Sequence, residues 1–135
     1  MRLKLRETKG EFILNGALEL LLTCLLVVLG ISTLGIAMQA NKLSTMAGDL
    51  TRYIEVRGQV DSSVDGELSR LETAGGIDVT LSVDTSYTAG GDRIQFGDPF
   101  TVKLSYTGRL GVGGVLSLPI PLSASVVGRS ERYWK

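Results

Sequence analysis

The sequence contains no histidine, one cysteine and three prolines among its 135 residues. Without histidine, zinc sites, haem sites and cysteine–histidine catalysis lose their usual ligand or base, and the lone Cys24 forms no internal disulfide. The chain also has no excess of charge of either sign, because 14 Lys and Arg residues balance 14 Asp and Glu residues. A neutral chain lacks the basic footprint of duplex binding, so we expect no nucleic-acid partner.

A catalytic constellation is missing as well. Serines are plentiful, but without histidine a serine nucleophile needs a lysine base, and no lysine stands at a matching spacing. The acids Asp61, Asp65 and Glu67 match only part of a calcium loop, because the third position holds Ser63. The stretch GRLGVGGV at 108–115 lacks the lysine of a P-loop and fits a flexible connection between strands. We therefore expect no enzyme activity, no catalytic residue, no metal ligand and no cofactor.

What the chain does have is a long apolar run near its start. From Leu20 to Asn41, 22 consecutive residues carry no charge. A helix rises about 1.5 Å per residue, so this run covers roughly 33 Å, enough for a hydrocarbon core of about 30 Å. We expect a transmembrane helix segment over 11–41. A secretory signal peptide is the alternative, but its apolar region is shorter, at about 7–15 residues, and ends at a cleavage site.

Four basic residues precede this run, namely Arg2, Lys4, Arg6 and Lys9. By the positive-inside rule they keep residues 1–10 in the cytoplasm as a basic leader. Residues 42–135 then face outward. The sequence therefore predicts a single-pass protein of the cell membrane with an extracytoplasmic C-terminal domain.

Helical periodicity continues beyond the membrane. One helix face takes the residues at three-and-four spacing, which are Leu43, Met46, Leu50, Tyr53, Ile54 and Arg57. No proline interrupts residues 1–98, so a single helix over about 12–57 is predicted, ending at Gly58. A second, shorter helix is predicted at about 62–74, with Asp61 or Ser62 as its cap. Together these parts make an amphipathic segment over 42–75.

The period then changes to that of strands. Apolar and polar residues alternate in IDVTLSVD at 77–84 and in TVKLSY at 101–106, which predicts half-buried strands. Ile94 and Phe96 indicate a further short strand. Because no helical crossover separates these segments, they form an antiparallel β domain over 76–135. The predicted fold class is α+β, with a long transmembrane and amphipathic helix packed on a small antiparallel sheet.

The end of the chain, LSASVVGRSERYWK at 122–135, is predicted to form the last strand. Tyr133 and Trp134 would then fall on opposite faces, so that one packs inward while the other lies at the rim. Deleting residues 129–135 is therefore expected to destabilise the domain.

An apolar and uncharged stretch, LGVGGVLSLPIPL, occupies 110–122. Pro119 and Pro121 are expected to deny it regular ladder hydrogen bonds. The stretch either covers one end of the small core or forms a contact patch for a neighbouring subunit or the membrane surface. The candidate patch residues are Leu110, Val112, Val115, Leu116, Leu118 and Ile120.

The layout of basic leader, apolar helix with an acid near its start, and small antiparallel sheet resembles type IV pilin-like proteins. More narrowly, KGEFILN, the helix ending IEVRG, and the terminal SASVVGRSERYWK are similar to a family of short pilin-like membrane proteins. That family is associated with conjugative elements of Gram-positive bacteria and is akin to the minor pilins of tight-adherence systems. The resemblance implies a structural subunit or minor pilin of a surface filament or conjugative transfer apparatus. It implies as partners the lipid bilayer, copies of itself or other pilin-like subunits, and a prepilin peptidase.

In pilins the leader peptidase cuts after a glycine, and an acid at the fifth mature position meets the neighbouring subunit's new N-terminal amine. A cut after Gly10 makes Glu11 the first residue and places Asn15 fifth, while a cut after Gly16 places Glu19 third. Neither cut places an acid fifth, so the chain departs from the pilin pattern here. The resemblance leaves Gly10 and Glu11 as the candidate cleavage junction and Asn15 and Glu19 as candidate assembly residues.

Glu19 is a single carboxylate in an otherwise uncharged apolar run, and an ionisable residue inside a membrane span is a functional hypothesis. It lies one position before the 22 uncharged residues, so it either marks the cytoplasmic interface or acts in assembly. In the assembly interpretation it is neutral in lipid and ionised once a neighbour's amine or a Lys9 side chain pairs with it. An ion or proton role is the third alternative.

Two other functions fit the same layout. One is a single-pass accessory protein of a conjugation or secretion channel that never polymerises. The other is an outward-facing binding module whose sheet holds a ligand or peptide. The binding module predicts a concave polar site in the sheet, and the sequence marks none.

Overall fold

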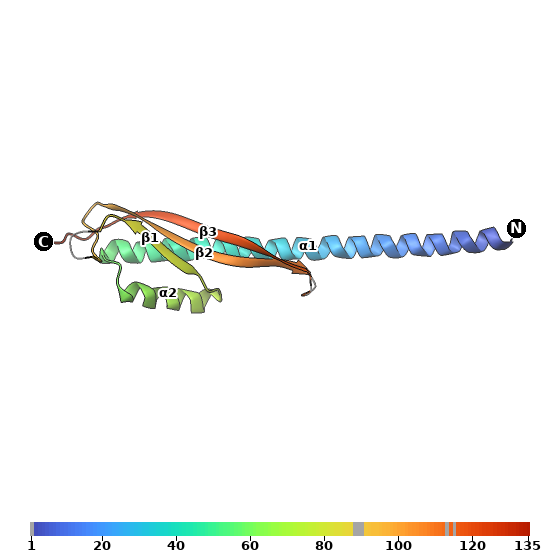
Figure 1. The fold of residues 1–135 in the computed structure, drawn as a ribbon, viewed down its shortest axis with the longest axis horizontal. Helices are drawn as coiled ribbons and strands as arrows, with labels where there is room; N and C mark the ends of the chain where they lie inside the picture. The colour runs from blue at the N-terminus through green and yellow to red at the C-terminus, as the bar shows by residue number, and fades with distance from the viewer. Residues whose placement is uncertain (1, 88–90, 113, 115) are drawn as a thin grey trace.

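The computed structural model describes residues 2–87, 91–112, 114 and 116–135, and side chains from Lys9 onward except that of Val112. Two helices precede three strands, in the order α1 (Arg2–Arg57), α2 (Ser62–Gly75), β1 (Thr80–Thr85), β2 (Pro99–Val112) and β3 (Leu116–Arg129). The strands form one antiparallel sheet with the order β1-β2-β3. The sheet lies along the C-terminal half of α1, and the N-terminal half projects beyond it (Figure 1). The predicted α+β class with an antiparallel meander is confirmed.

Helix α1 is one continuous helix of 56 residues. It begins at Arg2, ten residues before the predicted start, so the backbone of the basic leader is helical too. The reason is composition, because the leader consists mainly of Arg, Lys, Leu and Glu, which favour helix, and contains no proline. Its end was predicted correctly. Gly58 takes a φ of 67° and donates its N–H to the carbonyl oxygen of Ile54 at 2.7 Å, which closes the helix.

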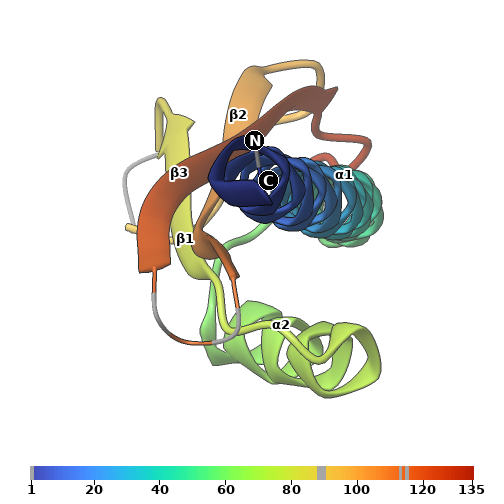
Figure 2. The same ribbon diagram turned by 90° about the vertical axis from the view of Figure 1, so that its right-hand side faces the viewer.

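The core lies between the C-terminal half of α1 and the facing side of the sheet. Seen along the helix axis, the sheet curves around one side of α1 while α2 runs beside it (Figure 2). The predicted helix face supplies Leu43, Leu50 and Ile54, each no more than 1% exposed. The whole buried cluster consists of Leu43, Met46, Ala47, Leu50, Ile54, Val64, Leu71, Ile77, Ile94, Phe100, Val102 and Leu104.

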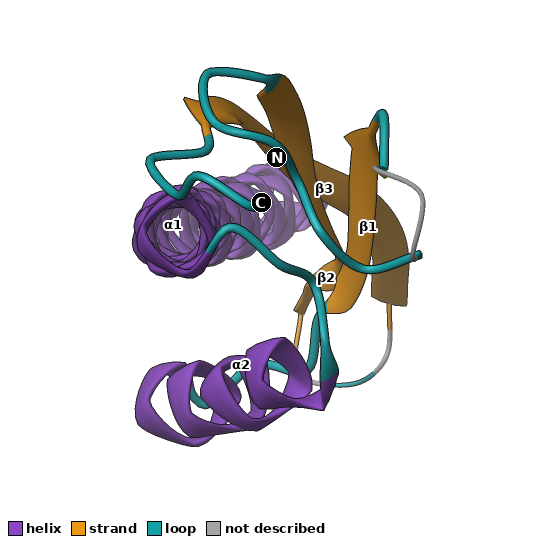
Figure 3. Ribbon diagram, turned by 90° about the vertical axis from the view of Figure 1, so that its left-hand side faces the viewer, coloured by secondary structure: helices purple, strands orange, loops and turns teal. Residues whose placement is uncertain are grey.

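Helix α2 is fixed at both ends by local chemistry. The Asp61 side chain accepts hydrogen bonds from the Ser63 hydroxyl and from the Ser63 backbone N–H, the latter at 3.0 Å. These bonds, the hydroxyl first, hold the pKa of Asp61 below its usual value. Gly76 closes the helix with a φ of 68°. Asp61 is thus the predicted helix cap. Helix α2 lies beside α1 and the sheet (Figure 3), and its buried residues Val64 and Leu71 join the core.

The sheet differs from the prediction mainly in where strands begin and end. Strand β2 runs through Gly108 and Gly111, so the flexible connection predicted at 108–115 is wrong for its first part. Pro119 and Pro121 lie inside β3, opposite Arg109 and Thr107, which corrects the expectation that they prevent pairing. Because β3 is an edge strand, its prolines can turn the missing N–H away from β2.

One predicted strand is wrong, and the predicted last strand is confirmed over 122–129 but is too long. Within the described residues no strand forms at 94–96, and the preceding Arg93 pairs with Gln59 in an isolated bridge. Residues 130–135 are not a strand either. Ser130 still exchanges backbone hydrogen bonds with Gly97 and Asp98, but the chain turns just before β2, so the ladder ends there. The tail is nevertheless held. The Trp134 indole N–H donates to the Gly58 carbonyl oxygen at 3.0 Å.

Candidate functional site

The part of α1 that projects beyond the sheet contains a long apolar segment (Figure 1). An 18-residue window within it has a mean hydropathy of 2.5, and none of that window is buried. The consecutive residues Leu20, Leu21 and Leu22 are 57–68% exposed although they point in different directions around the helix. A helix that is hydrophobic all round needs an apolar environment. The segment is long and apolar enough to anchor the chain in a membrane, and a signal sequence satisfies the same criteria.

Glu19 lies in this uncovered segment, in a shallow groove along the helix lined by Gly16, Leu20, Thr23 and Cys24. The Thr23 hydroxyl donates to the Glu19 main-chain carbonyl at 2.8 Å, which leaves the carboxylate available. Within the described side chains, Lys9 onward, no hydrogen bond or ion pair to that carboxylate is found. Lys9 is ten residues away, or about 15 Å along the helix axis, too far for its side chain to reach Glu19.

The other predicted residues of this region are also exposed on α1. Asn15 and Glu19 are four positions apart and therefore share one helix face. Gly10 and Glu11 precede them, and an added Cβ at Gly10 would meet no atom within 4 Å. The structure brings Asn15 and Glu19 together and places the candidate cleavage junction farther toward the N-terminus.

Gly10→Leu should therefore leave the fold intact, because leucine favours helix over glycine by about 0.8–1 kcal/mol and meets no clash here. If the leader is cut after Gly10, the variant is expected to accumulate as a heavier precursor, measured by intact-mass spectrometry. Gly35→Leu is the matched control, since it too has open space around it. If the Gly10 variant has the mature mass of the wild type, the leader is not cut after Gly10. If the wild type retains Met1, the leader is not cut at all.

The apolar patch predicted at 110–122 is the far end of the β2–β3 hairpin, which runs back along α1 toward the N-terminus (Figure 1). The Ser32 hydroxyl donates to the Gly111 carbonyl oxygen at 3.0 Å. Val28, Ser32 and Ile36 form one row at four-residue spacing and are half-buried. The hairpin therefore overlaps the apolar half of α1.

Exposure within the patch is uneven. Leu110 and Ile120 are half-buried, while Leu116 and Leu118 are 64% and 61% exposed. Val115 lies outside the described residues, and so does the side chain of Val112. The exposed part of the patch is thus at the start of β3, on the same side of the strand as the core residues.

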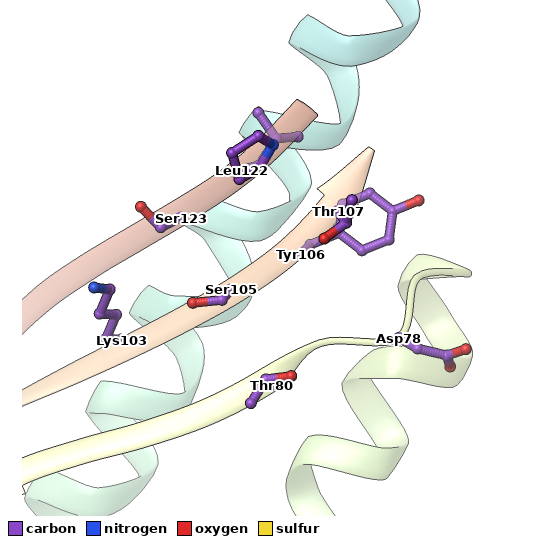
Figure 4. Close-up of a pocket in the computed structure, with 9 residues that line it drawn as sticks. Asp78, Thr80, Lys103, Ser105, Tyr106, Thr107, Leu122 and Ser123 are labelled. Atoms are coloured by element: carbon purple, nitrogen blue, oxygen red, sulfur yellow. The ribbon is translucent and has the colours of Figure 1, made fainter. Parts of the chain in front are cut away.

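A polar hollow of about 630 Å³ lies mainly on the opposite face of the sheet (Figure 4). Lys103 and Ser105 of β2 point into it and alternate with the buried Val102 and Leu104. The hollow is lined by Asp78, Thr80, Lys103, Ser105, Tyr106, Thr107, Pro121, Leu122 and Ser123. Sequence reasoning missed this concave site, although the polar half of the strand alternation was its visible sign.

Comparison with known proteins gives one match. Residues 20–135 match the family described as a domain of unknown function, DUF4320. No curated protein and no solved structure matches the chain. The matched region contains the sheet, the hairpin and most of α1, whereas Gly10, Glu11, Asn15 and Glu19 lie before it.

Proposed function

The chain belongs to the DUF4320 family, and we propose that it is a pilin-like structural subunit or minor pilin of a surface filament or transfer apparatus. In this proposal α1 crosses the cell membrane once, with the leader in the cytoplasm and the sheet domain outside. The observation that carries it is the shape of α1. One continuous helix is packed on a folded domain along its C-terminal half, and toward its N-terminus it carries a long apolar segment whose most apolar 18-residue window is not buried.

That arrangement supports storage in a bilayer followed by burial in a bundle of like helices. An apolar surface on every side of a helix is stable in lipid, and it is equally stable against other apolar helices. Such a subunit can leave the membrane without refolding, because its extramembrane core is complete within one chain. The mechanism is structural and requires no chemistry of bond making.

Glu19 is well placed to select a neighbour. At 3.6 residues per turn it lies about 140° around α1 from Ser32, so the hairpin does not cover it. Gly16 and Thr23 beside it are small, and small residues let a second helix approach closely. Because Lys9 of the same chain is out of reach, we assign the counter-charge to another subunit, as its Lys9 side chain or its N-terminal amine.

Glu19→Gln is the test of this assignment. The variant should insert into membranes normally but lose self-association by roughly tenfold or more, since breaking a buried ion pair costs about 3–5 kcal/mol. Co-purification of two differently tagged copies from mild detergent measures the loss. Asp84→Asn, which removes an exposed carboxylate of β1, is the control and should associate as the wild type does. If the Glu19 variant associates as strongly as the wild type, the carboxylate has no role in assembly and only marks the membrane interface.

A non-polymerising accessory protein of a transfer channel would use the same anchor. Filament isolation distinguishes the two, because only a subunit or minor pilin is recovered in sheared surface filaments. A copy found solely in the membrane fraction, bound to other proteins, would favour the accessory role.

A second candidate, an outward-facing binding module, is favoured by the polar hollow over the sheet. Its hydroxyl groups and the Lys103 ammonium suit a polar or anionic ligand or peptide. Ser105→Trp would fill the hollow without touching the core. Loss of a measured ligand contact in that variant, with self-association unchanged, would favour the module.

A further inference from the structure

The hairpin tip, formed by residues 110–112 of β2 and 116–120 of β3, lies beside the segment that anchors the chain. The contact between Ser32 and Gly111 fixes its level on α1. A membrane that holds the apolar half of α1 must therefore meet this hairpin. Its depth then depends on which part of α1 spans the hydrocarbon.

Two registers of α1 are possible in a bilayer. If the uncharged run from Leu20 to Asn41 spans it, Ser32 and the hairpin tip lie roughly 14 Å inside the hydrocarbon. Open strand edges are not tolerated there, because their backbone groups find no water. If Phe12 to Ile31 spans it, those 20 residues cover about 30 Å, the thickness of the core. The tip then lies at the outer boundary.

We infer that the hairpin tip is a second membrane-contacting element, seated in the outer interface of the bilayer, where it sets the depth of α1. This inference rests on the proposed anchoring by α1 and goes beyond it, since it assigns lipid as the partner of a β element. It also places Glu19 seven residues beyond Phe12, or about 10 Å into the hydrocarbon, instead of at the cytoplasmic surface.

The chemistry of the tip suits this position. From Leu110 to Gly128 the hairpin carries no charge, and Leu116 and Leu118 present exposed apolar side chains. Arg109 is the first charge above the tip and is exposed. It lies two strand residues, or about 7 Å, beyond Gly111, which is the level of the lipid headgroups in this register.

The two free edges of the tip also expose few backbone groups that would need hydrogen bonds from water. On the β2 edge, the Gly111 carbonyl accepts from Ser32 of α1. On the β3 edge, Pro119 and Pro121 remove two N–H donors that would otherwise point away from the sheet. Backbone groups that need water are therefore reduced on both sides of the hairpin where it meets lipid.

Site-specific fluorescence quenching tests the inference in the full chain. The protein is reconstituted in phosphatidylcholine–phosphatidylglycerol vesicles whose lipids carry a nitroxide either near the headgroup or deep in the acyl chain. A small fluorophore is attached to the native Cys24, or, in a Cys24→Ser background, to Leu118→Cys or Val127→Cys. Val127 is the matched control for Leu118, since both lie on β3 and they are 67% and 61% exposed.

We expect the Cys24 label to be quenched most by the deep nitroxide. The Leu118 label should be quenched by the shallow nitroxide at least twofold more than the Val127 label. Trp134 emission, compared with the wild type, confirms that each labelled variant is folded.

Each other result has a definite meaning. Quenching at Cys24 with Leu118 as unquenched as Val127 overturns the hairpin inference and leaves the anchor in place. Leu118 quenched most by the deep nitroxide overturns the outer-interface register. A Leu118 label shielded only at high protein density assigns the patch to a second copy, which also overturns the inference. No quenching at Cys24 removes the membrane anchor itself.

Discussion

Phe100→Ala is expected to lower the free energy of unfolding of the extramembrane domain by about 3–5 kcal/mol, the usual cost of emptying a buried phenylalanine site. Phe100 is 1% exposed and lies at the start of β2, opposite Gly128 of β3. It belongs to the buried cluster that α1 and the sheet share, and a Cβ built on Gly128 would lie 2.6 Å from both the Phe100 ring and the Thr51 side chain.

Unfolding of the detergent-solubilised chain by guanidinium, followed by emission of its single tryptophan, measures this loss. Phe96→Ala is the matched control, since Phe96 is 61% exposed and should change stability by less than about 0.5 kcal/mol. Equal midpoints for the two variants would mean that Phe100 does not hold the helix and the sheet together.

Deletion of residues 129–135 is expected to lower the melting temperature by about 10 °C or more, since each kcal/mol shifts a domain of this size by about 4–8 °C. The tail closes one end of the domain. Besides the Trp134–Gly58 bond, the Trp134 main-chain N–H donates to Gln95 Oε1 at 3.1 Å, and Glu131 N–H donates to the Glu55 carbonyl at 2.9 Å.

The Trp134 ring adds packing to these bonds. Arg93 and Arg132 lie over it, with guanidinium carbons 4.6 and 5.0 Å from the ring centroid. Losing a partly buried aromatic and several hydrogen bonds adds up to a few kcal/mol. Circular dichroism melting measures the effect, and deletion of the exposed Lys135 alone is the control. A melting temperature that stays at the wild-type value would show that the tail contributes nothing.

Periodicity predicted the parts of the fold that depend on neighbours in sequence. The buried face of α1, the Asp61 cap of α2 and the alternation in β1 and β2 all follow from local spacing. The errors lie where a distant partner decides. The tail alternates like a strand, but the chain turns just before β2 begins opposite Arg129, so the ladder does not continue past Ser130.

Glycine misled the prediction for a related reason. Gly108 and Gly111 suggest a loop, yet they lie in β2 because close approaches there exclude a side chain. A Cβ at Gly111 would lie 2.1 Å from the Leu116 carbonyl oxygen, and one at Gly108 would lie 2.9 Å from the Gln39 amide oxygen. Contacts with Gln39 and Leu116 are set by the hairpin and the helix together, so local sequence could not reveal them.

The candidate site divides in the same way. Glu19 and its apolar surroundings were identified from the sequence. The depth that we propose for it was not, because that proposal depends on the hairpin beside Ser32, some 79 positions away at Gly111.

The unbroken course of α1 also makes it a rigid shaft between the two ends of the molecule. With no proline or break from Arg2 to Arg57, a rotation of the sheet domain turns Glu19 through the same angle. Glu19 points about 140° away from the hairpin side, so a subunit that turns Glu19 toward a central axis turns its sheet toward the periphery. The polar hollow would then lie on the outer surface of an assembly, and one carboxylate would set the orientation of every subunit.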